Sequence, residues 1–178
     1  MACFIPKGQI NSIPTPANFR PLSLLPVPGK ILDGLLANRL RYYAHKGGHI
    51  SDDQYGFIPG RGTDDALQRV STFIKTELSN GCSILAISLD IKGAFDSASW
   101  EKLADCFQKM NLPVNLQNLA LSFLRDRTVT ASKDGVPRKL SQGCPQGSVC
   151  GPDLWNILFD SFFYYLNQIC TDNFKIHC

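Results

Sequence analysis

The sequence predicts an α+β protein in which helices pack on a small, incomplete sheet. Three observations support this fold class. Apolar residues recur at helical spacing in several separate segments. The apolar run 84–89 has the composition of a buried strand. Lys133-Asp134-Gly135 lies between two short β-type segments, and Asp-Gly indicates a hairpin turn.

Length and composition bound the class of protein. A chain of 178 residues fits one domain, and its 44% hydrophobic and 19% charged residues are ordinary for a globular protein. The net charge of +3 does not by itself demand a nucleic-acid partner. No uninterrupted apolar run approaches the ~18 residues of a membrane span. The first residues lack the pattern of a signal peptide, so we expect an intracellular protein without a membrane partner.

Cysteine usage agrees with that expectation. The seven cysteines are an odd number, and none forms a Cys-x-x-Cys pair. Cys144 and Cys150 lack nearby ligands of other types for a zinc site. We therefore expect reduced thiols.

The first third of the chain predicts one strand and one helix. Prolines make 4–28 extended and irregular, with a short strand at 19–25. A helix is expected over 30–44, with Arg39 and Arg41 facing solvent. Its apolar face is predicted to contain Ile31, Leu32, Leu35, Leu36, Leu40 and Tyr43.

A glycine-rich loop, 53–63, precedes the second predicted helix, where Thr63 suits the cap. Such a loop with Arg61 could hold a phosphate, but its spacing is not that of a P-loop, and a plain turn is the alternative. The buried face of this helix is expected to contain Ala66, Leu67, Val70, Phe73, Ile74 and Leu78.

Asp90 ends the predicted buried strand 84–89 and is followed by a tight turn, 93–96, and a helix from near Ser97. Ligands bind at such strand ends in open sheets, and a carboxylate there suits Mg²⁺. The alternative is that Asp90 only caps a turn.

The last part predicts two further helices, a hairpin, a loop and a long core helix. The helices cover 100–110 and 116–124, the hairpin pairs 128–130 with 136–140, and the turn-rich loop spans 142–148. The core helix spans about 151–169 and is apolar nearly all round.

Four blocks occur in order: 19–25 (FRPLSLL), 54–57 with 59–63 (QYGF, PGRGT), 89–96 (LDIKGAFD) and 143–148 (GCPQGS). Together they resemble the reverse transcriptase domain of non-LTR (LINE-type) retrotransposons over nearly the whole chain. The resemblance implies a right-hand polymerase fold in which 1–82 is fingers-like and 83–178 holds palm and interleaved elements. The family's aromatic-Ala-Asp-Asp hairpin, its thumb and any endonuclease are absent from the sequence.

The resemblance implies roles at the aspartate block. Asp90 matches the first catalytic aspartate, which in the complete enzyme binds two Mg²⁺ ions, with Mn²⁺ as an alternative. Ile91 is included in the metal site and would offer a backbone N–H to the triphosphate. Phe95 matches the aromatic ring that excludes a 2′-hydroxyl, although a core aromatic is the plainer interpretation of the residue alone.

The other blocks imply contacts to nucleotide and nucleic acid. Arg20 matches a fingers arginine on the nucleotide phosphates, and Lys7 is a second candidate. Gln146 and Gly147 match the loop against the nascent base pair. Arg61 and Gly62 are expected at the template or primer backbone, with a surface arginine as the alternative.

The implied function is a fragment of an RNA-directed DNA polymerase, inactive in isolation. Its partners in the complete enzyme are an RNA template, a DNA primer, deoxynucleoside triphosphates and the missing palm and thumb segments. The parent element would act in cytoplasm and nucleus. Two alternatives stay open: a decayed, non-catalytic remnant, which the departures Pro28, Ile58 and Cys150 favour, and a metal-dependent hydrolase built on Asp90 and Asp96.

The end of the sequence suggests one more strand. Residues 173–178 follow the long helix and resemble the strand that leads into the aromatic-Ala-Asp-Asp hairpin in relatives. We expect the coding sequence downstream of Cys178 to supply that block within roughly five codons, because hairpin turns are short.

Overall fold

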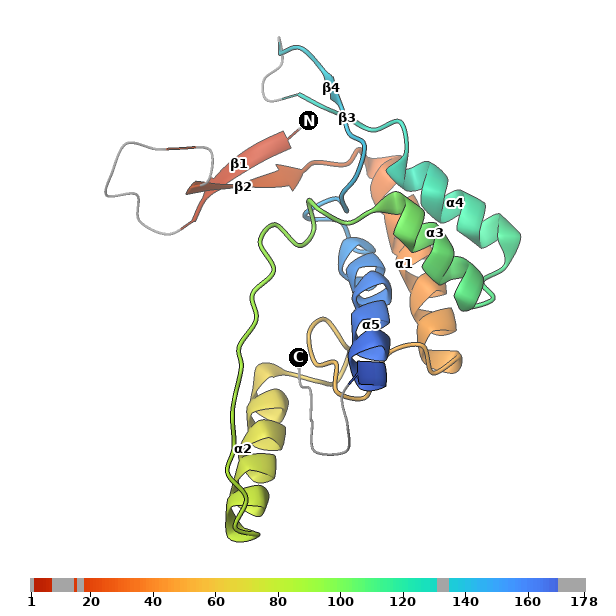
Figure 1. The fold of residues 1–178 in the computed structure, drawn as a ribbon. Helices are drawn as coiled ribbons and strands as arrows, with labels where there is room; N and C mark the ends of the chain where they lie inside the picture. Colours follow the sequence, from red (N-terminus) through yellow and green to blue (C-terminus); the bar gives the residue numbers. More distant parts are fainter. Residues whose placement is uncertain (1, 8–14, 16–17, 131–134, 170–178) are drawn as a thin grey trace.

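The computed structural model describes residues 2–7, 15, 18–130 and 135–169. In these residues the chain forms five helices and two antiparallel two-stranded sheets, which makes it α+β (Figure 1). The helices are α1 (Val27–Lys46), α2 (Thr63–Ser79), α3 (Trp100–Lys109), α4 (Val114–Leu124) and α5 (Gly151–Ile169). The strands are β1 (Ala2–Pro6), β2 (Phe19–Ser23), β3 (Thr128–Val129) and β4 (Arg138–Lys139).

Four helices form the body of the molecule. α5 packs against α1 and α3, and α4 packs against α1 and α3 (Figure 1). Phe107 of α3 is fully buried at their junction, and burial of such a ring contributes roughly 1.5–3 kcal/mol. Ser99 caps α3 by accepting the N–H of Lys102. The burial of Leu154 and Ile157 confirms the prediction that α5 is a core helix.

The buried face of α1 differs from the predicted one. Leu36 and Leu40 are buried as expected, but Ile31 and Leu35 are exposed. The helix begins at Val27, three residues earlier than predicted, because Pro28 is tolerated in a first helical turn. The face toward the body contains Asp33, Leu36, Ala37, Leu40 and Ala44.

The predicted buried strand 84–89 is wrong for this structure. The segment is extended, but no strand pairs with it among the described residues. Leu85 is 85% exposed and Leu89 is 73% exposed. A strand needs a hydrogen-bonded neighbour, and no described strand pairs with this segment, which runs back along α2 (Figure 1). The apolar composition of this segment therefore did not predict its exposure in the described structure.

The predicted buried face of α2 is also wrong, since no residue of α2 is buried. α2 and the segment that follows it project from the four-helix body as an arm (Figure 1). The helix begins at Thr63, but its capping interaction comes from Asp65, whose carboxylate accepts the N–H of Gly62 at 2.7 Å. Ala66, Val70, Phe73 and Ile74 of this helix are half-buried, whereas Leu67 and Leu78 are exposed.

Two hairpins complete the fold. β2 was predicted, and it pairs with β1 so that Arg20 lies opposite Ile5. β3 and β4 confirm the predicted second hairpin, although they are shorter than expected. Its turn residues 131–134 and the expected strand at 173–178 lie outside the described residues.

The described cysteines agree with the expectation of reduced thiols. The five described cysteines are free: Cys3, Cys82, Cys106, Cys144 and Cys150. None of the described helices is both long enough and apolar enough to cross a membrane.

Two carboxylates of α5 join this helix to its neighbours. Asp153 accepts a hydrogen bond from Nε of Arg41 at 2.7 Å, so Arg41 does not simply face solvent as predicted. Asp160 accepts the N–H of Ser51 at 2.7 Å. Burial raises the pKa of both carboxyls, and this effect exceeds the opposing effects of Arg41 and of the Ser51 N–H.

We expect Asp160 to make the chain less stable as pH rises. The folded state holds the Asp160 proton more tightly than the unfolded state, so this contribution is complete below the ordinary carboxyl pKa of about 3.9 and is lost above the raised pKa. Asp160→Asn imitates the protonated carboxyl. It should therefore stabilise the chain more at neutral pH than near the ordinary carboxyl pKa, as measured by urea unfolding. Asp105→Asn on α3 is the control, and an equal effect of Asp160→Asn at both pH values would contradict the expectation.

Candidate functional site

Three sequence blocks meet through main-chain hydrogen bonds. The N–H of Ser23 in β2 donates to the carbonyl of Gln146 at 2.8 Å. The N–H of Cys144 donates to the carbonyl of Phe95 at 2.7 Å, and a further bond from Gly143 reaches Ala98 at 2.8 Å. The loop 143–148 is therefore held between β2 and the turn 93–98, although these segments are far apart in the sequence.

Two glycines allow this close approach. Gly143 has φ +96°, and a Cβ there would lie 3.1 Å from the carbonyl oxygen of Asp96. Gly147 has φ +90°, and a Cβ there would lie 2.6 Å from Cδ1 of Leu22. Any larger residue would be strained at both positions and would push the loop away from β2 and the turn.

Gln146 and Gly147 lie at the centre of this loop, and Gln146 is half-buried. Nε2 of Gln146 donates to Oδ1 of Asp96 at 2.9 Å, which adds a side-chain link between loop and turn. Gly147 is exposed. The two loop residues predicted to contact nucleotide are therefore adjacent to the aspartate block, and Gly147 is open to solvent.

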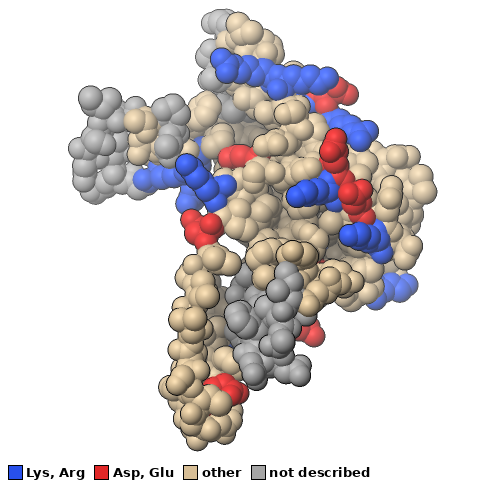
Figure 2. Space-filling model, viewed as in Figure 1, with Lys and Arg blue, Asp and Glu red and all other residues tan. Residues whose placement is uncertain are grey.

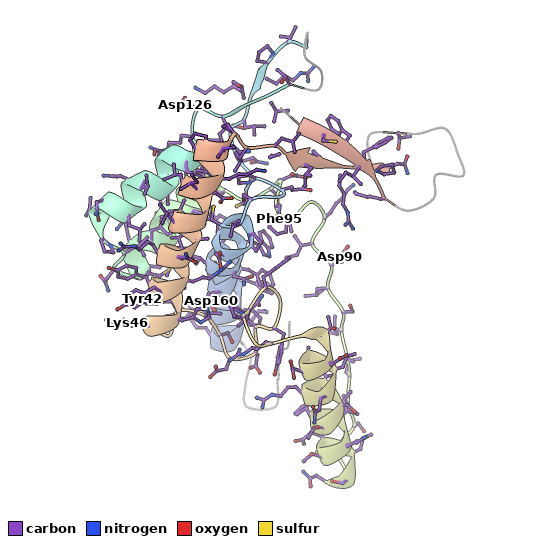
Figure 3. All side chains as sticks on the ribbon, turned by 180° about the vertical axis from the view of Figure 1, so that it is seen from behind. Tyr42, Lys46, Asp90, Phe95, Asp126 and Asp160 are labelled. Atoms are coloured by element: carbon purple, nitrogen blue, oxygen red, sulfur yellow. The ribbon has the colours of Figure 1, made fainter. Side chains whose placement is uncertain are left out.

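Phe95 lies between the body and this surface. Its ring is half-buried, with its centroid 6.0 Å from that of Trp155 near the start of α5. The ring of Phe57 meets it edge-on at 5.9 Å. In Figure 3, Phe95 lies beside α5, whereas Asp90 lies on the extended segment outside the helical body. Phe95 thus has both a packing role and an edge close to the candidate site.

Phe57 is held in place by a buried amide network. Asn156 of α5 donates from Nδ2 to the carbonyl of Gly56 at 2.9 Å, and Gln54 donates to Oδ1 of Asn156 at 3.2 Å. Phe57 itself has φ +59°, which is rare for a bulky residue. The second sequence block is therefore attached to α5, and its one strained residue is the one whose ring contacts Phe95.

Asp90 is exposed and makes no hydrogen bond or ion pair within the described part of the chain. Ile91 follows it on the same extended segment. The carboxylate of Asp90 could serve as one hard-oxygen ligand of Mg²⁺. The described residues contain no group of three His, Cys, Asp or Glu side chains that could bind a metal ion. They therefore supply one candidate ligand and do not complete a metal site, and they give no support to a hydrolase built on Asp90 and Asp96.

Arg20 and Lys7 lie at the same end of the β1–β2 hairpin. Arg20 is opposite Ile5, and the N–H of Lys7 donates to the carbonyl of Asn18 at 2.8 Å. Both residues are exposed, and neither forms an ion pair with another described residue. Lys and Arg side chains gather on the upper part of the face in Figure 2, while the α2 arm shows only acidic and uncharged residues there.

Arg61 is engaged by its own loop. Its guanidinium donates to the carbonyls of Asp52 at 2.7 Å and Gln54 at 3.0 Å, and it pairs with the Asp52 carboxylate at 3.0 Å. These contacts shape the loop before α2, in which Gly62 is the N-cap of the helix. They favour the structural interpretation of Arg61, and its contact with nucleic acid stays a prediction.

Two charged residues behind the loop were not singled out from the sequence. Asp33 on α1 accepts the N–H groups of Val149 and Cys150. Arg127 donates to Oγ of Ser23 at 3.4 Å and is half-buried, and burial lowers its pKa. Asp33 could have been noticed in the sequence, because it is an acidic residue on the same helical face as Leu36, Ala37 and Leu40. The sequence contains no comparable pattern for Arg127.

The thiols of Cys144 in this loop and of Cys150 just after it are buried. Burial raises the pKa of Cys144 to about 12, despite the opposing effect of Arg127. Burial likewise raises the pKa of Cys150, and a hydrogen bond with Asp33 adds to the effect. Because the thiolate is the reactive form, both side chains act as small buried groups at neutral pH.

Comparison with known families defines the chain as a domain of a template-directed polymerase. The β1–β2 hairpin, the segment with Asp90 and the loop 143–148 belong to this domain. The family described as reverse transcriptase (RNA-dependent DNA polymerase) matches residues 5–178. The chain therefore belongs to the reverse transcriptase family, and its relatives place it among the reverse transcriptase domains of non-LTR retrotransposons.

The relatives are proteins of insect mobile elements. The chain is 32% identical over 166 residues to a 115 kDa protein in the type-1 retrotransposable element R1DM of Drosophila melanogaster, covering 92% of this chain and 16% of that protein. It is 36% identical over 143 residues to the RNA-directed DNA polymerase from mobile element jockey of the same species, covering 79% and 16%. The Pol polyprotein from element R1 of Bradysia coprophila is 31% identical over 153 residues, covering 85% and 15%. The chain thus spans about a sixth of the length of these relatives.

Proposed function

We propose that this chain is the fingers and part of the palm of an RNA-directed DNA polymerase that extends a DNA primer on retrotransposon RNA. The observation that carries the proposal is the meeting of β2, the turn 93–98 and the loop 143–148 through main-chain hydrogen bonds. Arg20 and Lys7 belong to the same hairpin, and neither forms an ion pair with another residue that the structure describes. Such cations suit the phosphates of a nucleotide.

The proposed roles follow from these positions. Arg20 and Lys7 bind triphosphate, and Gln146 with Gly147 lies against the nascent base pair. Phe95 limits room at the sugar. Asp90 is the catalytic carboxylate and, with Ile91, the part of the metal site that this segment contributes. In the complete enzyme Mg²⁺ supplies charge stabilisation for nucleotidyl transfer, while the residues named here orient the nucleotide.

We further propose that the domain is truncated before the segment that completes the palm. The support is the extended segment around Asp90, whose apolar side chains are exposed, including Leu85, Ile87 and Leu89. Unpaired backbone and apolar side chains at such a place suit addition of neighbouring strands. Under this proposal 1–82 is fingers-like and 83–178 holds palm and interleaved elements. A decayed, non-catalytic copy is the alternative, favoured by the isolation of Asp90.

The purified chain is expected to bind primer–template but not to extend it. One carboxylate cannot supply the electrostatic stabilisation that phosphoryl transfer needs, whereas phosphate contacts need only cations. Fluorescence anisotropy with a labelled DNA primer on RNA should show salt-dependent binding. Primer extension with Mg²⁺ and deoxynucleotides should show no product.

Arg20→Ala should weaken this binding, while Lys109→Ala at the end of α3 serves as the matched control. No binding by the unaltered chain would contradict the proposed function. Extension by the unaltered chain would contradict the proposed truncation of the catalytic site.

A further inference from the structure

Asp33 is a buried carboxylate whose two oxygens both accept main-chain N–H groups. It lies on α1 and is 1% exposed. Oδ2 accepts the N–H of Val149 at 2.7 Å, and Oδ1 accepts the N–H of Cys150 at 3.0 Å. These donors immediately follow the loop 143–148 and immediately precede α5. A buried carboxylate is costly unless it is hydrogen-bonded, so its partners here are specific.

The junction between loop and helix is tightly connected at this point. Oγ of Ser148 accepts the N–H of Gly151 at 2.9 Å and donates to the carbonyl of Pro145 at 2.8 Å. N–H groups at the start of a helix have no partners within the helix. Ser148 and Asp33 together satisfy those of residues 149–151, which fixes where α5 begins and where the loop ends.

The loop is therefore attached at three places. Its first residues bond to the turn 93–98, Gln146 accepts from Ser23 of β2, and its end is bonded by Asp33. The turn and β2 belong to the candidate site itself. Asp33 acts from α1, which is a separate element. Gln146 and Gly147 lie between these attachments, so their position depends on all three.

The chemistry of this attachment requires an ionised carboxylate. A carboxylate has only acceptors and can receive both N–H groups. The amide of asparagine keeps one acceptor but turns an N–H₂ group toward the second N–H. Hydrogen bonds to a charged acceptor are also stronger than those between neutral groups. The shape-conserving change Asp33→Asn therefore removes one attachment and weakens the other.

We propose that Asp33 is a positioning residue for nucleotide selection: it holds Gln146 and Gly147 at the place where a deoxynucleoside triphosphate pairs with the template base. This inference rests on the proposed function. Asp33 touches neither nucleotide nor metal and acts through the loop backbone. Its loss should loosen the loop and weaken binding of the incoming nucleotide more than it slows the transfer step.

The first test measures loop mobility in the 178-residue chain. Hydrogen–deuterium exchange of 143–150 should become faster in Asp33→Asn, with circular dichroism unchanged. Asp153→Asn is the matched control, since Asp153 is also a buried carboxylate between α1 and α5 but contacts Arg41 rather than the loop. Asp33→Ser is the second variant if Asp33→Asn does not fold. Equal exchange in the Asp33 variant and the control would overturn the proposal.

The second test measures single-nucleotide incorporation by a full-length polymerase that carries this domain. Asp33→Asn should raise KM for the deoxynucleotide about tenfold while kcat changes much less, whereas Asp153→Asn should change neither. A lower kcat with unchanged KM would overturn the proposal. If the proposed function is wrong, the unaltered chain will not bind primer–template. The hydrogen–deuterium exchange experiment does not depend on that result and still decides whether Asp33 holds the loop.

Discussion

Asp90→Asn is expected to abolish DNA synthesis by a full-length polymerase that carries this domain, while the fold stays intact. Asparagine keeps the shape of the side chain and removes the charge that a divalent cation requires. Asp90 is exposed and makes no hydrogen bond or ion pair within the described residues, so the substitution breaks no contact there. Primer extension on an RNA template measures the loss, and circular dichroism measures the fold.

The matched control is Asp105→Asn, which neutralises an exposed carboxylate on α3. Its activity should equal that of the unaltered enzyme. If Asp90→Asn kept more than about a tenth of the activity, a barrier change of only ~1.4 kcal/mol, Asp90 would not be the catalytic carboxylate.

Phe95→Val is expected to let the same enzyme use ribonucleotides. The Phe95 ring packs on Trp155 and meets Phe57 edge-on, so its position is set by the body and by the second sequence block. Removing the ring opens space for a 2′-hydroxyl. Discrimination between deoxynucleotide and ribonucleotide, measured as the ratio of kcat/KM values, should fall at least about tenfold, or ~1.4 kcal/mol.

Phe159→Val separates this effect from loss of packing. Phe159 stacks on the same Trp155 ring at 5.7 Å but lies further along α5. Both substitutions should lower the free energy of unfolding by roughly 1–3 kcal/mol. Only Phe95→Val should alter sugar discrimination. An active Phe95→Val enzyme that rejects ribonucleotides at the original ratio would refute the proposed role.

Local patterns predicted several elements correctly. The helices α3 and α4 follow from apolar residues at helical spacing, and α5 follows from a long apolar segment. The β3–β4 hairpin was indicated by β-type residues on both sides of an Asp-Gly pair. These features depend mainly on residues close to one another in the sequence, which is why a single sequence contains them.

Long-range partners could not be predicted in the same way. The apolar run 84–89 indicated a strand, yet its backbone has no pairing strand among the described residues. α2 carries an apolar face of which no residue is fully buried in the described structure. Amphipathic patterns show that a face can be buried, but the partner lies elsewhere in the chain or outside it.

By itself, the sequence determined the family of this chain and the order of its motifs, because those blocks are linear patterns. The tertiary structure decided which of them meet: β2, the turn 93–98 and the loop 143–148 are joined by main-chain hydrogen bonds between distant residues. It also decided that Arg61 holds its own loop and that Asp33 bonds the start of α5. A side chain's partner depends on the packing of whole helices, so the residue type alone could not distinguish a ligand contact from a structural one.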